Sequence, residues 1–371
     1  MTPRVTVLIA THNDEAFVGA TIESVLAQTF TDFELVIVDD ASTDRSRDVA
    51  ASYRDPRIRR LANPMNRGAG ATRNAGLAAI ASEYVAELDG NDIALPQRLA
   101  QQLAYLEAHP EVAVVGGQSM LIDVAGRRIG AFTRPTTDLG IAWCGLFQSP
   151  VIHSTIMYRR AIVWDELGGY EERYHFGEDF DLWCRLARSH TIHNLSQTLV
   201  AYRSDPGSLT HTPAHDAREG YPVRKARMIL DNLRHVLRED VATRHEVDCW
   251  LALGDPTVAQ PGGDVRDAVA FVERCATRFA AVYGEDEQVA AHQAEMLVRA
   301  LRKGRAAGRL FMLRLWMAIR RRHPRTAWRA LPRFAIVWLF GTWPLEVRLA
   351  RRRSRAQRWK AEAVAARDRI T

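Results

Sequence analysis

The stretch that decides the fold is VTVLIATHNDEAFVGATIESVLAQTFTDFELVIVDDASTD, residues 5–44. It begins with an apolar run over 5–10, typical of a buried strand, and apolar residues then recur at helical spacing over 18–26. A second apolar run over 33–38 ends in Asp39 and Asp40. A strand, a helix and a strand in this order predict a parallel βαβ unit.

The same alternation continues to about residue 90. We expect a helix over 46–53, a strand near 58–61, a helix after the glycines at 68 and 70, and a strand over 84–88. This pattern predicts a doubly wound, mostly parallel, Rossmann-like α/β sheet. Further along, the sequence predicts a helix after Pro96 and strands at 112–115 and 119–124. From about residue 216 only helical patterns appear, at 216–239, 264–282, 285–303 and 308–322.

The start of the first helix carries its own signal. Asn13 is a residue type that caps helices, and Asp14 and Glu15 would then suit the positive end of the helix dipole. We therefore expect the helix to begin directly after Asn13.

Charge is distributed unevenly along the chain. The net charge is +6, but residues 301–371 hold 20 of the 50 Lys and Arg and only 3 of the 44 acids. This segment therefore carries +17 and the remainder −11. Together with the secondary-structure pattern, the asymmetry divides the chain into an α/β domain over 1–215, a helical region over 216–300 and a basic tail over 301–371.

Several classes of protein are excluded or made improbable by simple features. The four cysteines show no CxxC spacing, which disfavours a zinc site or a disulfide framework. The first residues lack the pattern of a signal peptide, and no apolar run reaches the roughly 18 residues of a membrane span. These features predict a cytoplasmic protein.

Polar residues follow two of the predicted strands at the point where each strand ends. Asp39 and Asp40 follow one strand, and Asp89 and Asn91 follow another. The carboxyl ends of parallel strands line the ligand crevice of an open α/β sheet, so these side chains could bind a ligand or a cation. They could equally cap helices or build turns.

Six segments in order resemble the inverting family-2 glycosyltransferases of the GT-A fold, over roughly residues 4–210. After the opening stretch they are NRGAGATRNAGL (66–77), YVAELDGNDIALPQRL (84–99), HSTIMYRRAIV (153–163), ELGGYEERYHFGEDFDLWCRLA (166–187) and LVAYRSDPGSLT (199–210). The resemblance implies that residues 1–215 form a catalytic domain that binds a nucleotide-sugar donor and a divalent metal, Mg²⁺ or Mn²⁺.

The resemblance also implies roles for individual residues. It places Asp179 as the catalytic base within the acid pair that it forms with Glu178. It places Asp89 and Asn91 in a DxD-type motif that holds the metal on the sugar diphosphate. The residues implied to lie beside the nucleotide are Ala10, Thr11, His12, Glu15, Asp39, Arg73 and Asp89.

The chemistry of such a reaction calls for these groups. A diphosphate leaving group needs charge neutralisation, which a hard cation on oxygen ligands supplies. The acceptor hydroxyl needs a carboxylate in hydrogen-bond reach to take its proton. A single displacement inverts the anomeric carbon. On local evidence, however, Glu178 and Asp179 could simply charge the first turn of a helix over 179–188.

The chain departs from the family pattern at two positions. Asn91 stands where the family usually has Asp, so one negative charge is lost. Either metal binding should weaken, or Asp92 helps to bind the metal. Asp205 stands where the family often has a His that contacts the metal or the diphosphate. We hypothesise that Asp205 restores the lost carboxylate as a metal ligand.

The basic tail over 301–371 contains five of the nine tryptophans, set in apolar runs beside arginine clusters. This composition suits binding to an anionic membrane surface. A helical packing or oligomer surface remains an alternative. Nucleic-acid binding is not expected, because no recognised module is present.

The sequence therefore predicts an inverting hexosyltransferase that acts on a glycan or lipid-linked acceptor, in bacterial surface polysaccharide synthesis, at the inner face of the cell membrane. A non-catalytic nucleotide-sugar-binding or assembly protein, and a nucleotidyltransferase, are the alternatives.

Overall fold

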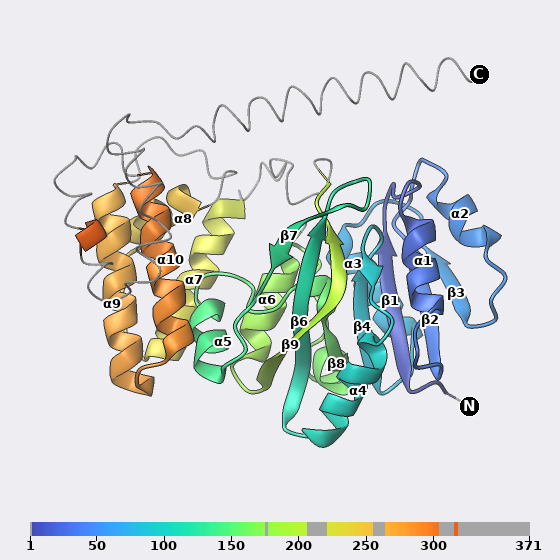
Figure 1. Ribbon diagram of the computed structural model, residues 1–371, viewed down its shortest axis with the longest axis horizontal. Coiled ribbons are helices and arrows are strands. Elements are labelled where there is room, and N and C mark those ends of the chain that lie inside the picture. Colours follow the sequence, from blue (N-terminus) through green and yellow to red (C-terminus); the bar gives the residue numbers. More distant parts are fainter. Residues whose placement is uncertain (1, 175–176, 206–220, 255–263, 304–314, 318–371) are drawn as a thin grey trace, which may run out of the picture. The chain divides into compact units, whose positions relative to one another are not determined.

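A computed structural model describes residues 2–174, 177–205, 221–254, 264–303 and 315–317. The chain divides into two compact units, one of residues 1–248 and 277–289, the other of 249–276 and 290–371. The sheet lies in the first unit (Figure 1). Most of the predicted basic tail and of the predicted helix over 308–322 lies outside the described residues, at 304–314 and 318–371.

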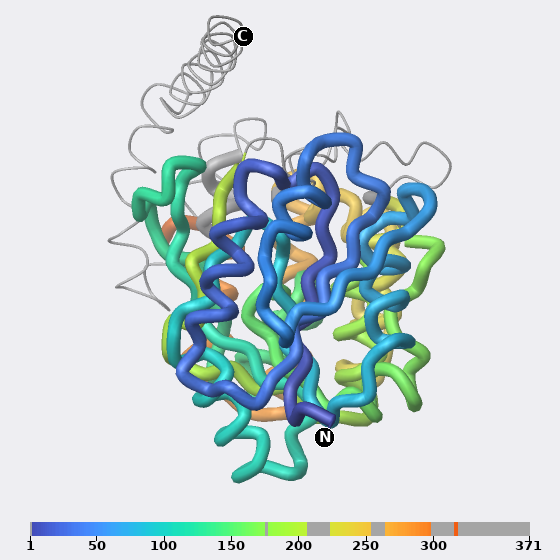
Figure 2. The backbone as a smooth tube through the Cα atoms, turned by 90° about the vertical axis from the view of Figure 1, so that its right-hand side faces the viewer, coloured from blue at the N-terminus to red at the C-terminus, as the bar shows by residue number. Residues whose placement is uncertain are grey.

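The first half of the sheet is parallel, in the order β3-β2-β1-β4. Figure 2 views the molecule from this end, with the blue N-terminal segments in front. The strands are β1 (Val5–Thr11), β2 (Phe33–Asp39), β3 (Ile58–Ala62) and β4 (Tyr84–Asp89), and the helices between them are α1 (Val18–Leu26), α2 (Ser46–Ser52) and α3 (Ala69–Ala79). The doubly wound pattern predicted for this half is confirmed.

The second half of the sheet is mixed, and the sheet joins nine strands among the residues that the structure describes. Strand β8 (Met157–Arg159) runs antiparallel to β4 and to β6 (Val112–Ile122), and β6 pairs in parallel with β9 (Thr191–Arg203). The short strand β5 (Ile93–Ala94) pairs with β9, and β7 (Arg128–Phe132) forms a hairpin with β6.

The strands predicted at 112–115 and 119–124 form the single strand β6. Gly116 and Gly117 lie between the two predicted strands, where side chains of β9 approach the backbone of β6 closely. A Cβ on Gly116 would lie 2.4 Å from Asn194 Oδ1, and one on Gly117 would lie 2.4 Å from Leu199 Cδ1. These glycines allow close approach rather than a break in the strand.

The core has two layers because alternate strand residues face opposite sides. On one face, Val5, Val7 and Ile9 of β1 pack with α1 and α4 (Arg98–Ala108). On the other face, Leu8 of β1 packs with α3 and α6 (Glu178–Leu186). The sheet is therefore covered on both faces, and its strand ends are left to form a site (Figure 1).

The described residues include further helices. Those that follow β9 are α7 (Tyr221–Leu237), α8 (Arg244–Gly254), α9 (Val265–Tyr283) and α10 (Glu287–Lys303), while α5 (Asp138–Gly145) lies earlier in the chain. The sequence pattern did not predict α8. In the portion of the chain that the structure describes, none of the helices has the length and hydrophobicity required to cross a membrane.

The expectation that Asn13 caps the first helix is wrong. Helix α1 begins at Val18, and Asn13 has a positive φ of 58°. Its side-chain oxygen instead accepts a hydrogen bond from the backbone N–H of Thr43, 2.8 Å away. Asn13 therefore joins two loops at the end of the sheet, which requires a partner 30 residues away that local sequence does not reveal.

Candidate active site

The carboxyl ends of β1, β2 and β4 meet at one edge of the sheet. In the strand register, Thr11 lies opposite Asp39, and Ala10 lies opposite Asp89. Residues implied by the resemblance on three separate strands are thus brought side by side. The site consists of this edge and the segments that cover it.

Asp39 has one oxygen engaged by the protein and one that is free. Its Oδ2 accepts hydrogen bonds from the Ser42 backbone N–H, at 3.0 Å, and from Arg47 Nε. Its Oδ1 is buried and has no hydrogen-bond partner among the described residues. A buried acceptor without a partner is costly, so this oxygen is suited to a donor group of a ligand.

Asp40 holds the glycine-rich turn in place, a role that the sequence reasoning missed. Its carboxylate accepts hydrogen bonds from the backbone N–H groups of Arg67 and Gly68, both at 2.9 Å, and from Asn63 Nδ2 at 2.8 Å. Gly68, with φ of 85°, precedes the first residue of α3. Asp40 therefore fixes the start of the helix that carries Arg73.

The loops after β1 and β2 are fastened to each other. His12 Nδ1 lies 2.7 Å from the Asp40 carbonyl oxygen, and Glu15 accepts a hydrogen bond from the Arg45 backbone N–H at 3.0 Å. His12 is exposed at the edge, whereas Glu15 is half-buried. The structure thus places both predicted nucleotide-binding residues in loops beside Asp39, and the nucleotide contact itself stays a prediction.

Arg73 on α3 joins three carboxylates beneath the edge. Its Nη2 lies 2.8 Å from Asp89 Oδ1, its Nη1 lies 3.0 Å from Glu178 Oε1, and its Nε lies 3.6 Å from Glu87 Oε2. Burial disfavours the charge of Arg73, but Asp89 and the other carboxylates raise its pKa above the ordinary value. The contact between Arg73 and a nucleotide remains a prediction, because the structure shows this side chain paired with protein acids.

Glu87 is a second residue that the sequence reasoning missed. It is buried in the middle of β4, and burial raises its pKa to about 7. The hydroxyl groups of Tyr158 and Tyr170 donate hydrogen bonds to its Oε1, at 2.7 and 3.2 Å. The sequence did offer a signal for Glu87, because it is an acid within the apolar run of a predicted strand. A buried acid needs hydrogen-bond partners or a cation.

The acid pair lies at the start of α6. Burial raises the pKa of Glu178 to about 7, and the neighbouring charge of Asp179 adds to this effect, whereas Arg73 opposes it. Asp179 is half-buried, its pKa is also raised by burial, and its Oδ1 accepts a hydrogen bond from the Phe180 backbone N–H at 2.7 Å. Arg73 connects this pair to Asp89, so the pair belongs to the same charge cluster rather than to the helix alone.

Asp89 and Asn91 lie at the end of β4 and just beyond it. Burial opposes the charge of Asp89, but Arg73 and His153 hold its pKa below the ordinary value. Its Oδ1 receives Arg73, and among the described residues its Oδ2 accepts no hydrogen bond. Asn91 is half-buried, and its backbone oxygen accepts a hydrogen bond from Arg203 Nε at 2.8 Å.

These two side chains fit a divalent metal. They offer one free carboxylate oxygen and one amide oxygen, and Mg²⁺ is commonly held by one or two protein carboxylates together with substrate phosphates and water. Asp92 is less suited, because it is fully buried and its Oδ1 accepts the Arg203 backbone N–H at 2.7 Å. Burial, together with the charge of Asp89, raises the pKa of Asp92 to about 8.

Asp205 follows the end of the strand that contacts the Asn91 segment. Strand β9 ends at Arg203, which bonds to Asn91 and Asp92, and Asp205 follows two residues later. Asp205 is half-buried, and its backbone N–H donates to the Arg203 carbonyl at 3.2 Å. Its role as a metal ligand stays a prediction.

The cluster predicts unequal effects of one substitution at two arginines. We expect Arg73→Met to lower the free energy of unfolding by about 3–5 kcal/mol, because it leaves buried carboxylates without their cation. Arg67→Met removes an exposed pair with Glu172 and should cost only about 0–1 kcal/mol. Urea unfolding of both variants measures the difference, and equal losses would contradict the assignment of Arg73.

The comparisons with known proteins agree with this geometry. The model of the family described as "Glycosyl transferase family 2" matches residues 6–167. The putative glycosyltransferase EpsE of Bacillus subtilis is 35% identical over 210 residues, covering 55% of this chain and 74% of EpsE. The amylovoran biosynthesis glycosyltransferase AmsE of Erwinia amylovora is 28% identical over 239 residues, covering 63% of this chain and 86% of AmsE.

A solved structure shares the fold. Residues 1–349 of TarS from S. aureus, crystallised in complex with UDP-GlcNAc, superpose with a TM-score of 0.54 at 18% identity, covering 92% of this chain and 93% of that one. This likeness shows the predicted GT-A architecture, and the sequence relationship to EpsE over most of its length shows the family. The chain is a transferase that belongs to glycosyltransferase family 2.

Proposed function

We propose that this enzyme transfers a hexose from a nucleoside-diphosphate donor to a hydroxyl of a glycan or lipid-linked acceptor, with inversion at the anomeric carbon. The observation that carries the proposal is the Glu178–Asp179 pair, which Arg73 holds beside Asp89 at the edge where Asp39 offers a free oxygen. A proton acceptor and a diphosphate site are thereby joined in one cluster.

In this proposal the donor lies along the ends of β1, β2 and β4. The free Oδ1 of Asp39 accepts a hydrogen bond from the base or the ribose. The backbone of Ala10 and Thr11 and the side chains of His12 and Glu15 border the nucleotide. Arg73 positions the carboxylates of Asp89 and Glu178. A direct contact between Arg73 and the nucleotide is also part of the proposal.

Asp179 acts as the general base. Its raised pKa makes it a better proton acceptor than an ordinary surface Asp, and Glu178 keeps a negative charge beside it when ionised. The acceptor hydroxyl loses its proton to Asp179 as its oxygen attacks the anomeric carbon, and the nucleoside diphosphate leaves from the opposite face. One such displacement inverts the configuration.

Asp89 and Asn91 would hold the divalent metal, with Asp205 as a further ligand. When bound, the metal neutralises the charge that develops on the leaving diphosphate. The free Oδ2 of Asp89 and the hard oxygen donors of this set support the assignment.

The biological setting follows from the names of relatives. AmsE is named for amylovoran biosynthesis, and ExoO of Rhizobium meliloti, 39% identical over 106 residues, is named for succinoglycan biosynthesis. We place this enzyme in the synthesis of a bacterial surface polysaccharide.

The base assignment predicts a large loss of activity in one variant and a small one in its neighbour. Asp179→Asn should lower the transfer rate by about 10²–10⁴-fold, because the acceptor loses its proton acceptor. Asp181→Asn, on the same helix turn but paired with Arg185, should retain most activity. In the wild type, the rate should rise between about pH 6 and pH 8, since the acid pair must be ionised to accept a proton.

Product analysis separates the alternatives. Transfer releases a nucleoside diphosphate, whereas a nucleotidyltransferase would release pyrophosphate. Donor binding without turnover on a panel of acceptors, unchanged in Asp179→Asn, would instead indicate a binding protein and would contradict the proposal.

The metal assignment predicts opposite effects at two positions. Asn91→Asp adds a carboxylate and should lower the Mn²⁺ concentration that gives half-maximal activity, and Asp205→Ala should raise it. Metal titrations of turnover at fixed donor concentration measure both. An unchanged metal dependence in Asp205→Ala would remove that residue from the site.

We further propose that the basic tail over 301–371 binds the anionic inner face of the cell membrane. Each arginine near the lipid should contribute about 1 kcal/mol to the free energy of membrane binding. Replacement of Arg320–Arg322 and Arg351–Arg353 by Gln should strongly reduce flotation of the full chain with anionic vesicles. Equal flotation of both proteins would favour the alternative, a surface that packs on protein.

A further inference from the structure

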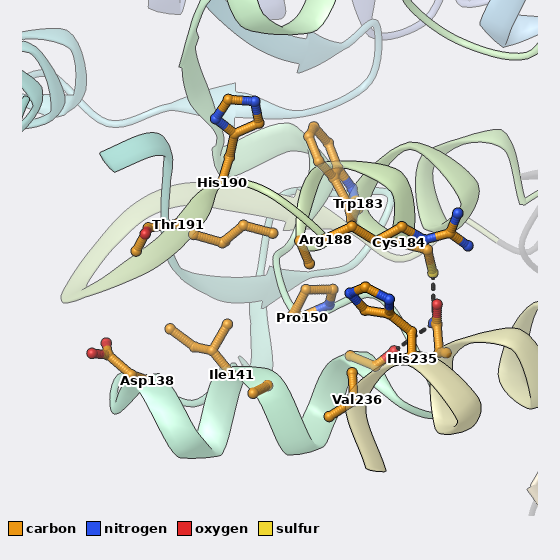
Figure 3. Close-up of a pocket in the computed structure, with 15 residues that line it drawn as sticks. Asp138, Ile141, Pro150, Trp183, Cys184, Arg188, His190, Thr191, His235 and Val236 are labelled. Carbon is orange, nitrogen blue, oxygen red and sulfur yellow. Dashed lines mark hydrogen bonds between the residues drawn. The ribbon is translucent and has the colours of Figure 1, made fainter. Parts of the chain in front are cut away.

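A cavity of about 290 Å³ lies among α5, the end of α6 and α7, within the first unit (Figure 3). Its volume is at the low end of the roughly 300–1,000 Å³ that is typical of ligand pockets. None of the residues assigned to the donor, the metal or the base lines it. The cavity is therefore separate from the site described above, although α6 contributes to both.

The walls of the cavity are largely apolar. Ile141 on α5, Ile192 on β9 and Val236 on α7 contribute aliphatic surface, and Pro150 and the ring of Trp183 complete it. Figure 3 labels Ile141, Pro150, Trp183 and Val236 among the side chains that line the cavity. This lining favours a ligand with an apolar body.

The lining residues include two basic side chains, Arg188 and His235. Arg188 and His235 are exposed at the rim, and in the described part of the chain neither has an acidic partner. The Arg188 guanidinium therefore favours a ligand that supplies acceptor oxygens.

The acid at the rim does not neutralise these donors. Asp138 lies 3.2 Å from His193 Nε2, so it already has a partner. The remaining histidine, His190, is bonded to Glu166 at 2.9 Å. The charge at the rim that has no opposite partner among the described residues is therefore that of Arg188.

We propose that this cavity binds a small amphiphile with an apolar chain and an anionic head group. The chain lies against Ile141, Ile192 and Val236, and the head group meets Arg188 and His235. The lining accounts for both parts of the ligand, because it combines aliphatic walls with a guanidinium at the rim that has no acidic partner in the described part of the chain.

The first test is calorimetric titration of the full chain with octanoate, hexanoate and 1-octanol. Octanoate should bind at one saturable site. It should bind about 15-fold more tightly than hexanoate, since each of two methylenes contributes about 0.8 kcal/mol. Octanol, which lacks the charge, should bind at least about tenfold more weakly than octanoate. No saturable binding, or octanol binding as tightly as octanoate, would overturn the proposal.

Variants locate the site. Ala142→Phe fills the cavity and Arg188→Gln removes the rim charge, so each should weaken octanoate binding about tenfold or more. The matched controls Ala79→Phe and Arg54→Gln change exposed residues elsewhere and should bind like the wild type. Wild-type affinity in both cavity variants would show that octanoate binds elsewhere and would also overturn the proposal.

Thermal unfolding of each variant accompanies the titrations. If Ala142→Phe does not fold, two results still test the proposal. They are the comparison of Arg188→Gln with Arg54→Gln, and the relative affinities of octanoate, hexanoate and 1-octanol. The readout is binding rather than sugar transfer, so its outcome is independent of the proposed function.

Discussion

The site depends on one buried cation. Arg73 is almost wholly shielded from solvent, and it contacts carboxylates that would otherwise repel one another at the end of β4. Without it, those acids would be protonated or exposed, because a buried charge without a partner is strongly disfavoured. Arg73 also joins segments 105 residues apart, so the side chain that holds the acid pair of α6 at the sheet edge also lowers the pKa of Asp89.

The carboxylates at the strand ends differ in how many of their oxygens accept hydrogen bonds from the protein. Asp40 is buried, and both of its oxygens are bound by groups around the glycine-rich turn. Asp39 and Asp89 each use one oxygen within the protein and leave the other free. Asp39 and Asp89 both lie at the carboxyl ends of their strands, at the edge where the donor is proposed to bind. This division separates residues that build the site from residues that are suited to bind.

Local patterning predicted the architecture well because it reflects burial. Alternation of strand and helix periods over residues 5–90 follows from a sheet covered on both faces, and β1 to β4 and their helices appear where this alternation places them. The errors occurred where a distant partner decides the structure. Asn13 bonds to Thr43 instead of capping α1, and the glycines of β6 accommodate Asn194 and Leu199 instead of ending a strand.

The sequence by itself determined the fold class, the family and the acids at the strand ends, since each depends on residue types in a fixed order. Only the tertiary structure decided which of these acids share a cation, because the contacts of Arg73 with Glu87 and Glu178 cross distances in sequence that no local pattern covers. It also revealed Glu87 and Asp40 as residues that position the site, and the cavity beside α6. Burial and partner geometry, which set the charge state of every acid here, exist only once the chain has folded.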